Sequence, residues 1–377
     1  MRLSMNTSLA TLKPSGIRRI NALAAQHPGC IALALGEPDF PTPDVISAEV
    51  TAALGRGDTH YPPNNGRPVL REALSAYMGD AGLTFSADEV ILTDGATEAL
   101  SATFMAMLNP GDEVIIPTPA FGLYESIVVA NHAKAVFLDT EPARFQIDED
   151  ALRDCVTPAT KAIVICSPNN PTGDVAPLDF VAALCDACPG MVMVDEAYVE
   201  FADDSFGAAT TAQGLIAEHP NLVILHTLSK AFGAAGTRLG YVIAAPEVID
   251  VFAAIRQIYS VNVLSQATAL ACVRARDAYT PVVAQVASER ERELCALRAM
   301  AAEGLTVEAW PSAANFVLVR TPHATRVRER LRDEYSILVR DFSYAPGLAD
   351  CLRITVGTPQ ENDEVLAAFA ALVKEEM

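Results

Sequence analysis

The sequence has few basic residues and no long apolar run. Lysine and arginine together number 27, against 47 aspartate and glutamate residues, in a chain of 377. Proteins that bind a nucleic-acid backbone need clustered positive charge, so this balance argues against a nucleic-acid partner. The apolar runs are short and interrupted, and none reaches the roughly 20 residues that a membrane-spanning helix requires. We therefore expect neither nucleic acid nor membrane among the partners.

The sequence also lacks the marks of secretion and of a metal centre. Residues 1–13 contain no charged segment followed by a long apolar core, so we expect no secretory signal. The eight cysteines are scattered, which favours a reducing, cytoplasmic location. Cys185 and Cys188 form a lone C-x-x-C. Without a second pair or a thioredoxin-like context, this spacing indicates neither zinc nor redox chemistry, and we expect no metal.

What the chain does contain is typical of a globular enzyme of two unequal parts. Hydrophobic residues make up 51% and charged residues 20% of the 377 positions, which excludes a disordered chain and allows a sizeable core. Apolar strands alternate with helical segments from about residue 44 to residue 259, which predicts an α/β fold with a mainly parallel, helix-covered sheet. We expect a large domain over residues 44–264 and a smaller α/β domain built from residues 1–43 and 265–377.

The most informative stretch is residues 227–233, Thr-Leu-Ser-Lys-Ala-Phe-Gly. It follows the apolar run 222–225, which reads as a buried strand. Burying the Lys230 ammonium group is costly unless it is paired or chemically used. Together with Thr227, Ser229 and Arg238, it supplies an amine, two hydroxyls and a guanidinium, the groups that can hold a phosphorylated aldehyde. On this stretch alone, a surface lysine in a flexible loop remains an alternative.

Two further segments place polar groups at the ends of predicted strands. Residues 191–194 are apolar and end in Asp195, so a buried strand delivers a carboxylate to the rim of the sheet, where it needs a cation. A metal site or a strand-end salt bridge would also fit that pattern. Residues 90–93 form a strand that turns at Gly95 into a helix reaching about Leu108. Since a helix N-terminus binds phosphate, Ala96 and Thr97 are candidate phosphate contacts.

Residues 227–233, with Thr-Arg-Leu-Gly-Tyr at 237–241, resemble the lysine segment of pyridoxal-phosphate (PLP) aminotransferases of fold type I, class I/II. Within that family, these segments are most similar in sequence to the histidinol-phosphate aminotransferase branch. The resemblance extends from Lys13 to Asn362. It implies a ping-pong transfer of an amino group between an L-amino acid, or histidinol phosphate, and an oxo acid such as 2-oxoglutarate. PLP would be the cofactor.

The resemblance also implies a role for each matching residue around the cofactor. Lys230 would hold the cofactor aldehyde and move the proton, and Asp195 would pair with the pyridine nitrogen. Asn170, in Asn-Pro-Thr-Gly, and Tyr198 would share the phenolic oxygen, and the Phe121 ring would stack on the pyridine face. Stacking of that kind contributes about 1 kcal/mol beyond area burial. The phosphate would be held by Ala96, Thr97, Thr227, Ser229 and Arg238.

The same resemblance implies substrate contacts and a partner subunit. Arg353 would grip the substrate carboxylate, since a planar guanidinium suits bidentate binding, and Arg340 would lie near the distal end. Asn170 and the backbone at Gly36 would line the substrate pocket. Tyr61 matches a tyrosine that reaches the partner subunit's cofactor phosphate, which implies a homodimer with shared sites. A buried core tyrosine would fit the sequence at that position equally well.

The identity of the substrate stays open at this level. Residues 36–41, Gly-Glu-Pro-Asp-Phe-Pro, depart from the Asn-rich loop of the histidinol-phosphate branch and resemble aspartate or aromatic enzymes. A carbon–sulfur β-lyase and an amino-acid phosphate decarboxylase share the lysine chemistry and are alternatives. A non-catalytic PLP-binding regulatory protein is an alternative from another class, against which Lys230, Asp195 and Arg353 argue.

Overall fold

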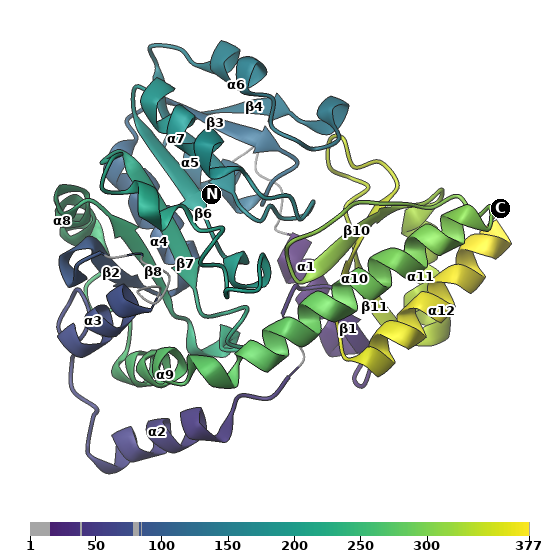
Figure 1. Ribbon diagram of the computed structural model, residues 1–377, viewed down its shortest axis with the longest axis horizontal. Helices are drawn as coiled ribbons and strands as arrows, with labels where there is room; N and C mark the ends of the chain where they lie inside the picture. Colours follow the sequence, from purple (N-terminus) through teal and green to yellow (C-terminus); the bar gives the residue numbers. More distant parts are fainter. Residues whose placement is uncertain (1–15, 38–39, 78–82, 84, 377) are drawn as a thin grey trace, which may run out of the picture.

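The computed structural model describes residues 16–37, 40–77, 83 and 85–376, so the expected lead-in at 13–15 and Pro38–Asp39 lie outside the described residues. Two helix-flanked sheets form two unequal lobes (Figure 1). The larger sheet has seven strands in the order β2-β8-β7-β6-β5-β3-β4. All neighbouring pairs are parallel except those of β8, which runs antiparallel to β2 and β7. This arrangement confirms the predicted mainly parallel sheet. Its strands are β2 (Val90–Thr93), β3 (Glu113–Thr118), β4 (Lys134–Asp139), β5 (Thr160–Cys166), β6 (Met191–Asp195), β7 (Leu222–Thr227) and β8 (Gly240–Ala244).

The central strands are buried on both faces, which explains their almost continuous apolar sequences. Side chains alternate between two cores: Val192 and Val194 of β6 join one, and Met193 joins the other. Helices α4, α5 and α8 pack on the Met193 side. By the same alternation, the Asp195 side chain emerges on the Met193 side at the end of β6. The helices of this lobe are α2 (Asp44–Gly55), α3 (Pro68–Ala76), α4 (Gly95–Met107), α5 (Leu123–Ala130), α6 (Glu149–Cys155), α7 (Leu178–Ala187), α8 (Pro246–Ile255) and α9 (Val263–Arg274).

The smaller sheet has five strands in the order β1-β11-β12-β10-β9. β1 comes from the N-terminal segment and pairs in parallel with β11, so both ends of the chain contribute to this lobe. β11 and β12 run antiparallel, and Arg340 on β11 lies directly opposite Arg353 on β12. The elements of this lobe are β1 (Ile31–Leu33), β9 (Glu308–Ala309), β10 (Phe316–Arg320), β11 (Ile337–Asp341), β12 (Cys351–Thr355), α1 (Gly16–Gln26), α11 (Ala324–Tyr335) and α12 (Pro359–Glu376).

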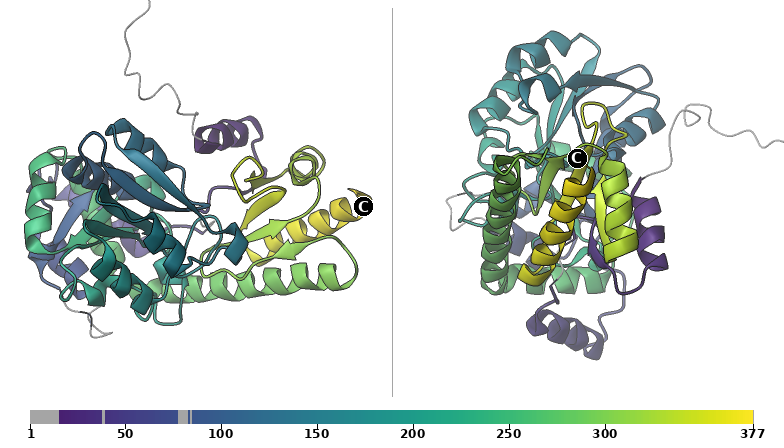
Figure 2. Two further views of the ribbon diagram at one scale, coloured as in Figure 1. Left: turned by 90° about the horizontal axis from the view of Figure 1, so that it is seen from above. Right: turned by 90° about the vertical axis from the view of Figure 1, so that its right-hand side faces the viewer.

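One long helix, α10 (Thr280–Ala302), belongs to both lobes. Figure 2 shows it running from the large lobe along the small one. Val283 and Val286 pack into the core of the large sheet, whereas Leu294 and Leu297 pack into the core of the small one. α9 packs on α2 and α3 of the large lobe. We therefore propose a boundary between the lobes within α10, later than the residue 265 expected from the sequence.

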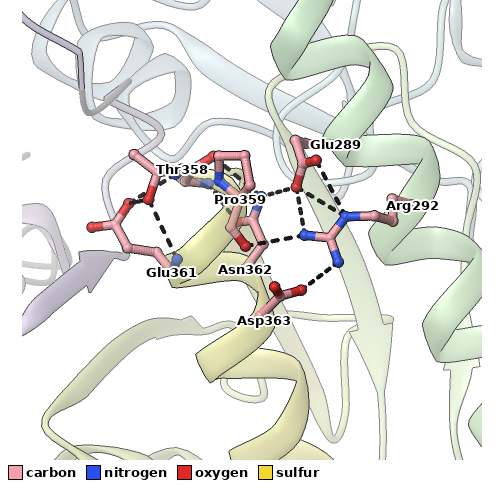
Figure 3. A network of polar contacts seen from close by, with 8 residues as sticks. Glu289, Arg292, Thr358, Pro359, Glu361, Asn362 and Asp363 are labelled. Carbon is pink, nitrogen blue, oxygen red and sulfur yellow. Dashed lines mark hydrogen bonds and ion pairs between the residues drawn. The ribbon is translucent and has the colours of Figure 1, made fainter.

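A polar network fixes the end of β12 to α10 (Figure 3). The Asn362 amide nitrogen donates to Glu289 at 2.8 Å and to the Gly357 carbonyl at 3.1 Å. The Gly357 N–H donates to Asn362 Oδ1 at 2.8 Å. Arg292 bridges Glu289 and Asp363, both at 2.6 Å. The strand that carries Arg353 is thus tied to the helix shared by the two lobes. No helix in the described parts of the chain is long and apolar enough to cross a membrane.

Candidate active site

The candidate residues converge where β5, β6 and β7 end. Asp195 is the last residue of β6, Asn170 lies four positions beyond β5, and Lys230 three positions beyond β7. These three strands are adjacent and parallel, so their carboxyl ends meet at one edge of the sheet. Open α/β sheets bind their ligands at this edge.

Asp195 is buried and receives two hydrogen bonds. The Tyr124 hydroxyl donates to Oδ2 at 2.7 Å, and the Ala197 N–H donates to Oδ1 at 3.2 Å. Burial raises the pKa of Asp195, and these two bonds oppose the rise. A cation beside the carboxylate would stabilise its charged form. Tyr124 was not predicted as a site residue. It lies three residues after Phe121, on the first turn of α5.

The Lys230 amine lies beside the aromatic ring of Tyr198, with Nζ 5.6 Å from the ring centroid. Burial, reinforced by the positive charge of Arg353, lowers the pKa of Lys230 to about 8, and Glu37 opposes the change. Near neutral pH a useful fraction of such an amine is uncharged. An uncharged amine can act as a nucleophile and as a base.

A hydrogen-bonded chain joins Tyr198 to Arg353. The Asn170 amide donates to the Tyr198 hydroxyl at 3.3 Å and accepts from Arg353 Nη1 at 2.6 Å. Arg353 Nη2 donates to the Ala34 carbonyl at 3.0 Å. Gly36 adopts φ +67°, and a Cβ there would lie 3.5 Å from both Arg353 and the Tyr198 hydroxyl. The β1 end of the small lobe thus lies against the site.

Two buried arginines share one face of the small sheet. Arg353 lies over the Phe316 ring at 4.6 Å and over the Phe342 ring at 5.6 Å, measured to the centroids. Arg340 lies 5.5 Å from the Phe342 centroid. Burial lowers the pKa of Arg353 to about 10, so this guanidinium stays charged at neutral pH. Because the two positive groups repel each other, an anion between them would lower the energy of both.

A separate anion cradle surrounds the start of α4. Gly95 opens this helix, so the backbone N–H groups of Ala96 and Thr97 lie in its first turn. A Cβ on Gly95, which has φ +69°, would collide with the Arg238 guanidinium. Thr227 donates to the Ser229 hydroxyl at 2.8 Å, and both are buried.

A buried ion pair on the opposite face of the sheet holds together the strand ends that carry these groups. His226 on β7 and Glu196 after β6 form a fully buried pair with 2.9 Å between Nε2 and Oε2. Thr211 and the Ala212 N–H donate to the same carboxylate at 2.6 and 2.7 Å. Glu196 raises the pKa of His226 against the effect of burial. This pair holds β6 and β7 together next to Asp195 and Lys230.

Two further candidates carry aromatic rings: Phe121 lies beside Tyr124, the partner of Asp195, whereas Tyr61 lies at the surface. The Phe121 ring is half-buried and meets Tyr124 edge-on at 5.7 Å. Tyr61 is 81% exposed, so the buried core role left open by the sequence is wrong. Its ring stacks on Tyr259 at 4.3 Å, beside the exposed Ile258. Within the described part of the chain, no group of three His, Cys, Asp or Glu side chains is placed to hold a metal ion.

Comparison with known proteins decides the family. The model of aminotransferase class I and II matches residues 28–369. The chain is a class I and II aminotransferase. The enzyme is 33% identical over 353 residues to a histidinol-phosphate aminotransferase of Ruminiclostridium cellulolyticum, covering 93% of this chain and 94% of that one. It is 34% identical to histidinol-phosphate aminotransferase 2 of Cupriavidus pinatubonensis, covering 97% and 100%. Among solved structures, a double mutant of Thermus thermophilus aspartate aminotransferase superposes with a TM-score of 0.84 at 30% identity, covering 99% and 100%.

Members of this family use PLP. The aminotransferase has side chains that fit each part of that molecule. Asp195 offers a buried carboxylate to the pyridine nitrogen, and Lys230 offers an amine to the aldehyde. The first turn of α4, with Arg238 and Ser229, suits the phosphate, and the glycine at position 95 leaves room for the Arg238 guanidinium. The residues present therefore fit the group.

Proposed function

We propose that this aminotransferase takes an amino donor that carries a phosphate dianion, with histidinol phosphate as the best candidate, and that 2-oxoglutarate is the acceptor. The observation that carries the proposal is the buried pair Arg340 and Arg353, opposite each other on β11 and β12 and grouped around the Phe342 ring. Two guanidiniums match a doubly charged phosphate better than a single carboxylate. The names of the relatives support the same donor.

The position of each remaining side chain indicates its proposed role in the reaction. PLP, when bound, supplies an electron sink for the bond broken at the donor carbon. Lys230, with its lowered pKa, would take the proton from the donor carbon as a base and then give it up again as an acid. Asp195 keeps a positive charge on the ring nitrogen, and Tyr198 and Asn170 hold the phenolic oxygen. The Phe121 ring stacks on the ring face, and Gly36 leaves space for the donor beside Arg353. The phosphate is held by Ala96, Thr97, Thr227, Ser229 and Arg238.

Removing one arginine should separate phosphate donors from carboxylate donors. We expect Arg340→Leu to raise KM for histidinol phosphate at least about tenfold, equivalent to about 1.4 kcal/mol, while KM for aspartate changes little. The reason is that a dianion uses both guanidiniums, whereas a carboxylate is satisfied by Arg353 alone. Steady-state kinetics with both donors provide the measurement. Arg326→Leu, at an exposed position on α11, is the matched control. Equal KM changes for the two donors would contradict a dianion site.

A donor screen tests the reaction type itself. Histidinol phosphate, aspartate, glutamate, phenylalanine and cystathionine are added singly to the holoenzyme, and conversion of the cofactor to its amino form is followed by absorbance. We expect conversion fastest with histidinol phosphate. Pyruvate and ammonia release without that conversion would indicate a carbon–sulfur lyase, and carbon dioxide release would indicate a decarboxylase.

We also propose a homodimer in which Tyr61 reaches the partner subunit's cofactor phosphate. Supporting this, the tyrosine is 81% exposed and forms an apolar patch with the exposed side chains of Ile258 and Tyr259. Sedimentation velocity should give a single dimer species, and Tyr61→Phe should increase the dissociation constant for PLP because one phosphate hydrogen bond is lost. A monomer with full cofactor affinity would exclude this arrangement.

A further inference from the structure

A cavity lies beside the active-site residues, where β3, β4 and β5 end. Its volume is about 220 Å³, and its wall includes Pro117 of β3, Thr140 after β4 and Cys166 of β5. Lys230, Asp195 and Arg353 do not line it. It shares Tyr124 with the active site, whose hydroxyl bonds to Asp195. Open α/β sheets bind ligands at their carboxyl edge, so the position of this cavity makes it a candidate ligand site.

The cavity has one carboxylate whose bonding is incomplete. Asp174 lines it, and the side chain of Gln146 donates to its Oδ1 at 2.7 Å. Asp174 Oδ2 is buried, and no described group meets strict hydrogen-bond geometry to it, although the Thr172 side chain lies near enough to lower the pKa of the carboxyl. A buried carboxylate oxygen in that state costs free energy, which a donor or a cation would recover.

The other titratable groups around the cavity leave Asp174 as its main negative charge. Glu149 also lines the cavity but is paired with Arg153 at 2.6 Å, and the described lining includes no lysine or arginine. Burial raises the pKa of both Tyr124 and Cys166, which keeps them uncharged near neutral pH. Burial also raises the pKa of Asp174 to about 6, with Thr172 and Gln146 opposing the rise. Asp174 is thus ionised above neutral pH, when a cation could bind.

The remaining wall is apolar and is held in a strained conformation. Phe145 and Phe180 line the cavity together with Ile147 and Val175. Phe145 has φ +70° and follows Arg144 at φ +54°, two successive non-glycine residues in the left-handed region. A left-handed backbone at a non-glycine residue is strained, and such strain clusters at functional sites. The Phe145 ring meets Trp310 of the small lobe edge-on at 5.2 Å.

We propose that this cavity is a second small-molecule site, which binds a compact organic cation through Asp174. A planar amidinium or guanidinium head would donate to the free Oδ2, and an apolar body would lie between Phe145 and Phe180. Its occupant would touch Tyr124, which bonds to Asp195, and Phe145, which meets the small lobe. The site stands on its own contacts and does not depend on the identity of the amino donor.

Benzamidinium chloride is a suitable probe, because its planar head suits bidentate contact with a carboxylate and its ring suits the apolar walls. The holoenzyme is titrated at pH 7.5 while the fluorescence of Trp310, the single tryptophan of the chain, is recorded, with calorimetry as an independent readout. We expect a saturable change in both. Sodium chloride at equal concentration is the control for ionic strength.

Three variants sharpen the test. Asp174→Asn should raise the dissociation constant at least about tenfold, whereas Asp179→Asn, at an exposed position outside the lining, should leave it unchanged. Ile147→Phe should abolish binding by filling the cavity, which keeps the test valid if the first variant is poorly folded. Binding to the wild type should weaken at pH 5, where Asp174 is protonated. Equal dissociation constants in the wild type, Asp174→Asn and Ile147→Phe, or no saturable heat in the wild type, would overturn the proposal.

Discussion

Replacing Lys230 with alanine is expected to lower kcat for transamination by about 10⁴-fold while the protein still binds PLP. The lysine is the group placed to move a proton at the donor carbon, and its pKa of about 8 suits it to act as base and then as acid. A positioned acid–base group contributes about 10²–10⁴-fold in rate, and Lys230 is also the amine that holds the aldehyde. Cofactor affinity should persist because the proposed phosphate contacts at Arg238, Ser229 and the start of α4 are not changed by this substitution.

The measurement combines cofactor content with single-turnover kinetics. PLP retained after desalting is quantified in Lys230→Ala, and conversion of the bound cofactor by histidinol phosphate is followed by stopped-flow absorbance. Lys161→Ala, at an exposed position on β5, serves as the control and should behave as wild type. Wild-type conversion rates in Lys230→Ala would overturn the assignment of the catalytic lysine.

The Asp195→Asn variant is expected to lower kcat by about 10²–10³-fold with a small change in donor KM. The amide has the same size as the carboxylate. Its oxygen can still accept from the Ala197 N–H, and its Nδ2 can donate to the Tyr124 hydroxyl, which now bonds to Asp195 Oδ2. What is lost is the negative charge, which stabilises the protonated ring nitrogen most strongly when electrons flow into the ring. Removing one preorganised electrostatic contact of this kind typically costs about 10²–10³ in rate.

Separate determination of kcat and KM tests this expectation. A fall in kcat with nearly constant KM shows that the charge acts in the chemical step, whereas a rise in KM alone would show a binding role only. Asp186→Asn replaces a 77% exposed carboxylate on α7 and should leave both parameters unchanged. An unchanged kcat in Asp195→Asn would contradict the proposed pairing with the ring nitrogen.

The predicted features that the structure reproduces are those with local causes. Residues 191–195 and 222–227 are strongly apolar, which marks β6 and β7 as strands buried on both faces. Because parallel neighbours end at one edge, Asp195 and Lys230 had to meet once those strands were adjacent. Gly95 and the residues after it mark a strand-to-helix turn, whose N–H groups are free in any fold.

Other features depend on contacts between distant segments. Nothing in residues 121–124 shows that the Tyr124 hydroxyl will bond to Asp195, 71 positions away. The start of the small lobe, expected at residue 265, is hard to place from the sequence because the periodicity of α9 and α10 does not show which core each helix joins. Only the packing of Val283 and Leu294 into different cores places that boundary.

The sequence by itself determined the α/β class, the order of the strands along the chain and the chemical groups at their ends, because apolar periodicity and strand-end polar residues are local properties. The tertiary structure alone decided how those groups combine. It set Arg340 opposite Arg353 around Phe342, stacked Tyr61 on Tyr259 at the surface, and brought Asp174 to the wall of a cavity. These relations come from strand register and from packing between lobes, which depend on contacts between segments far apart in the sequence.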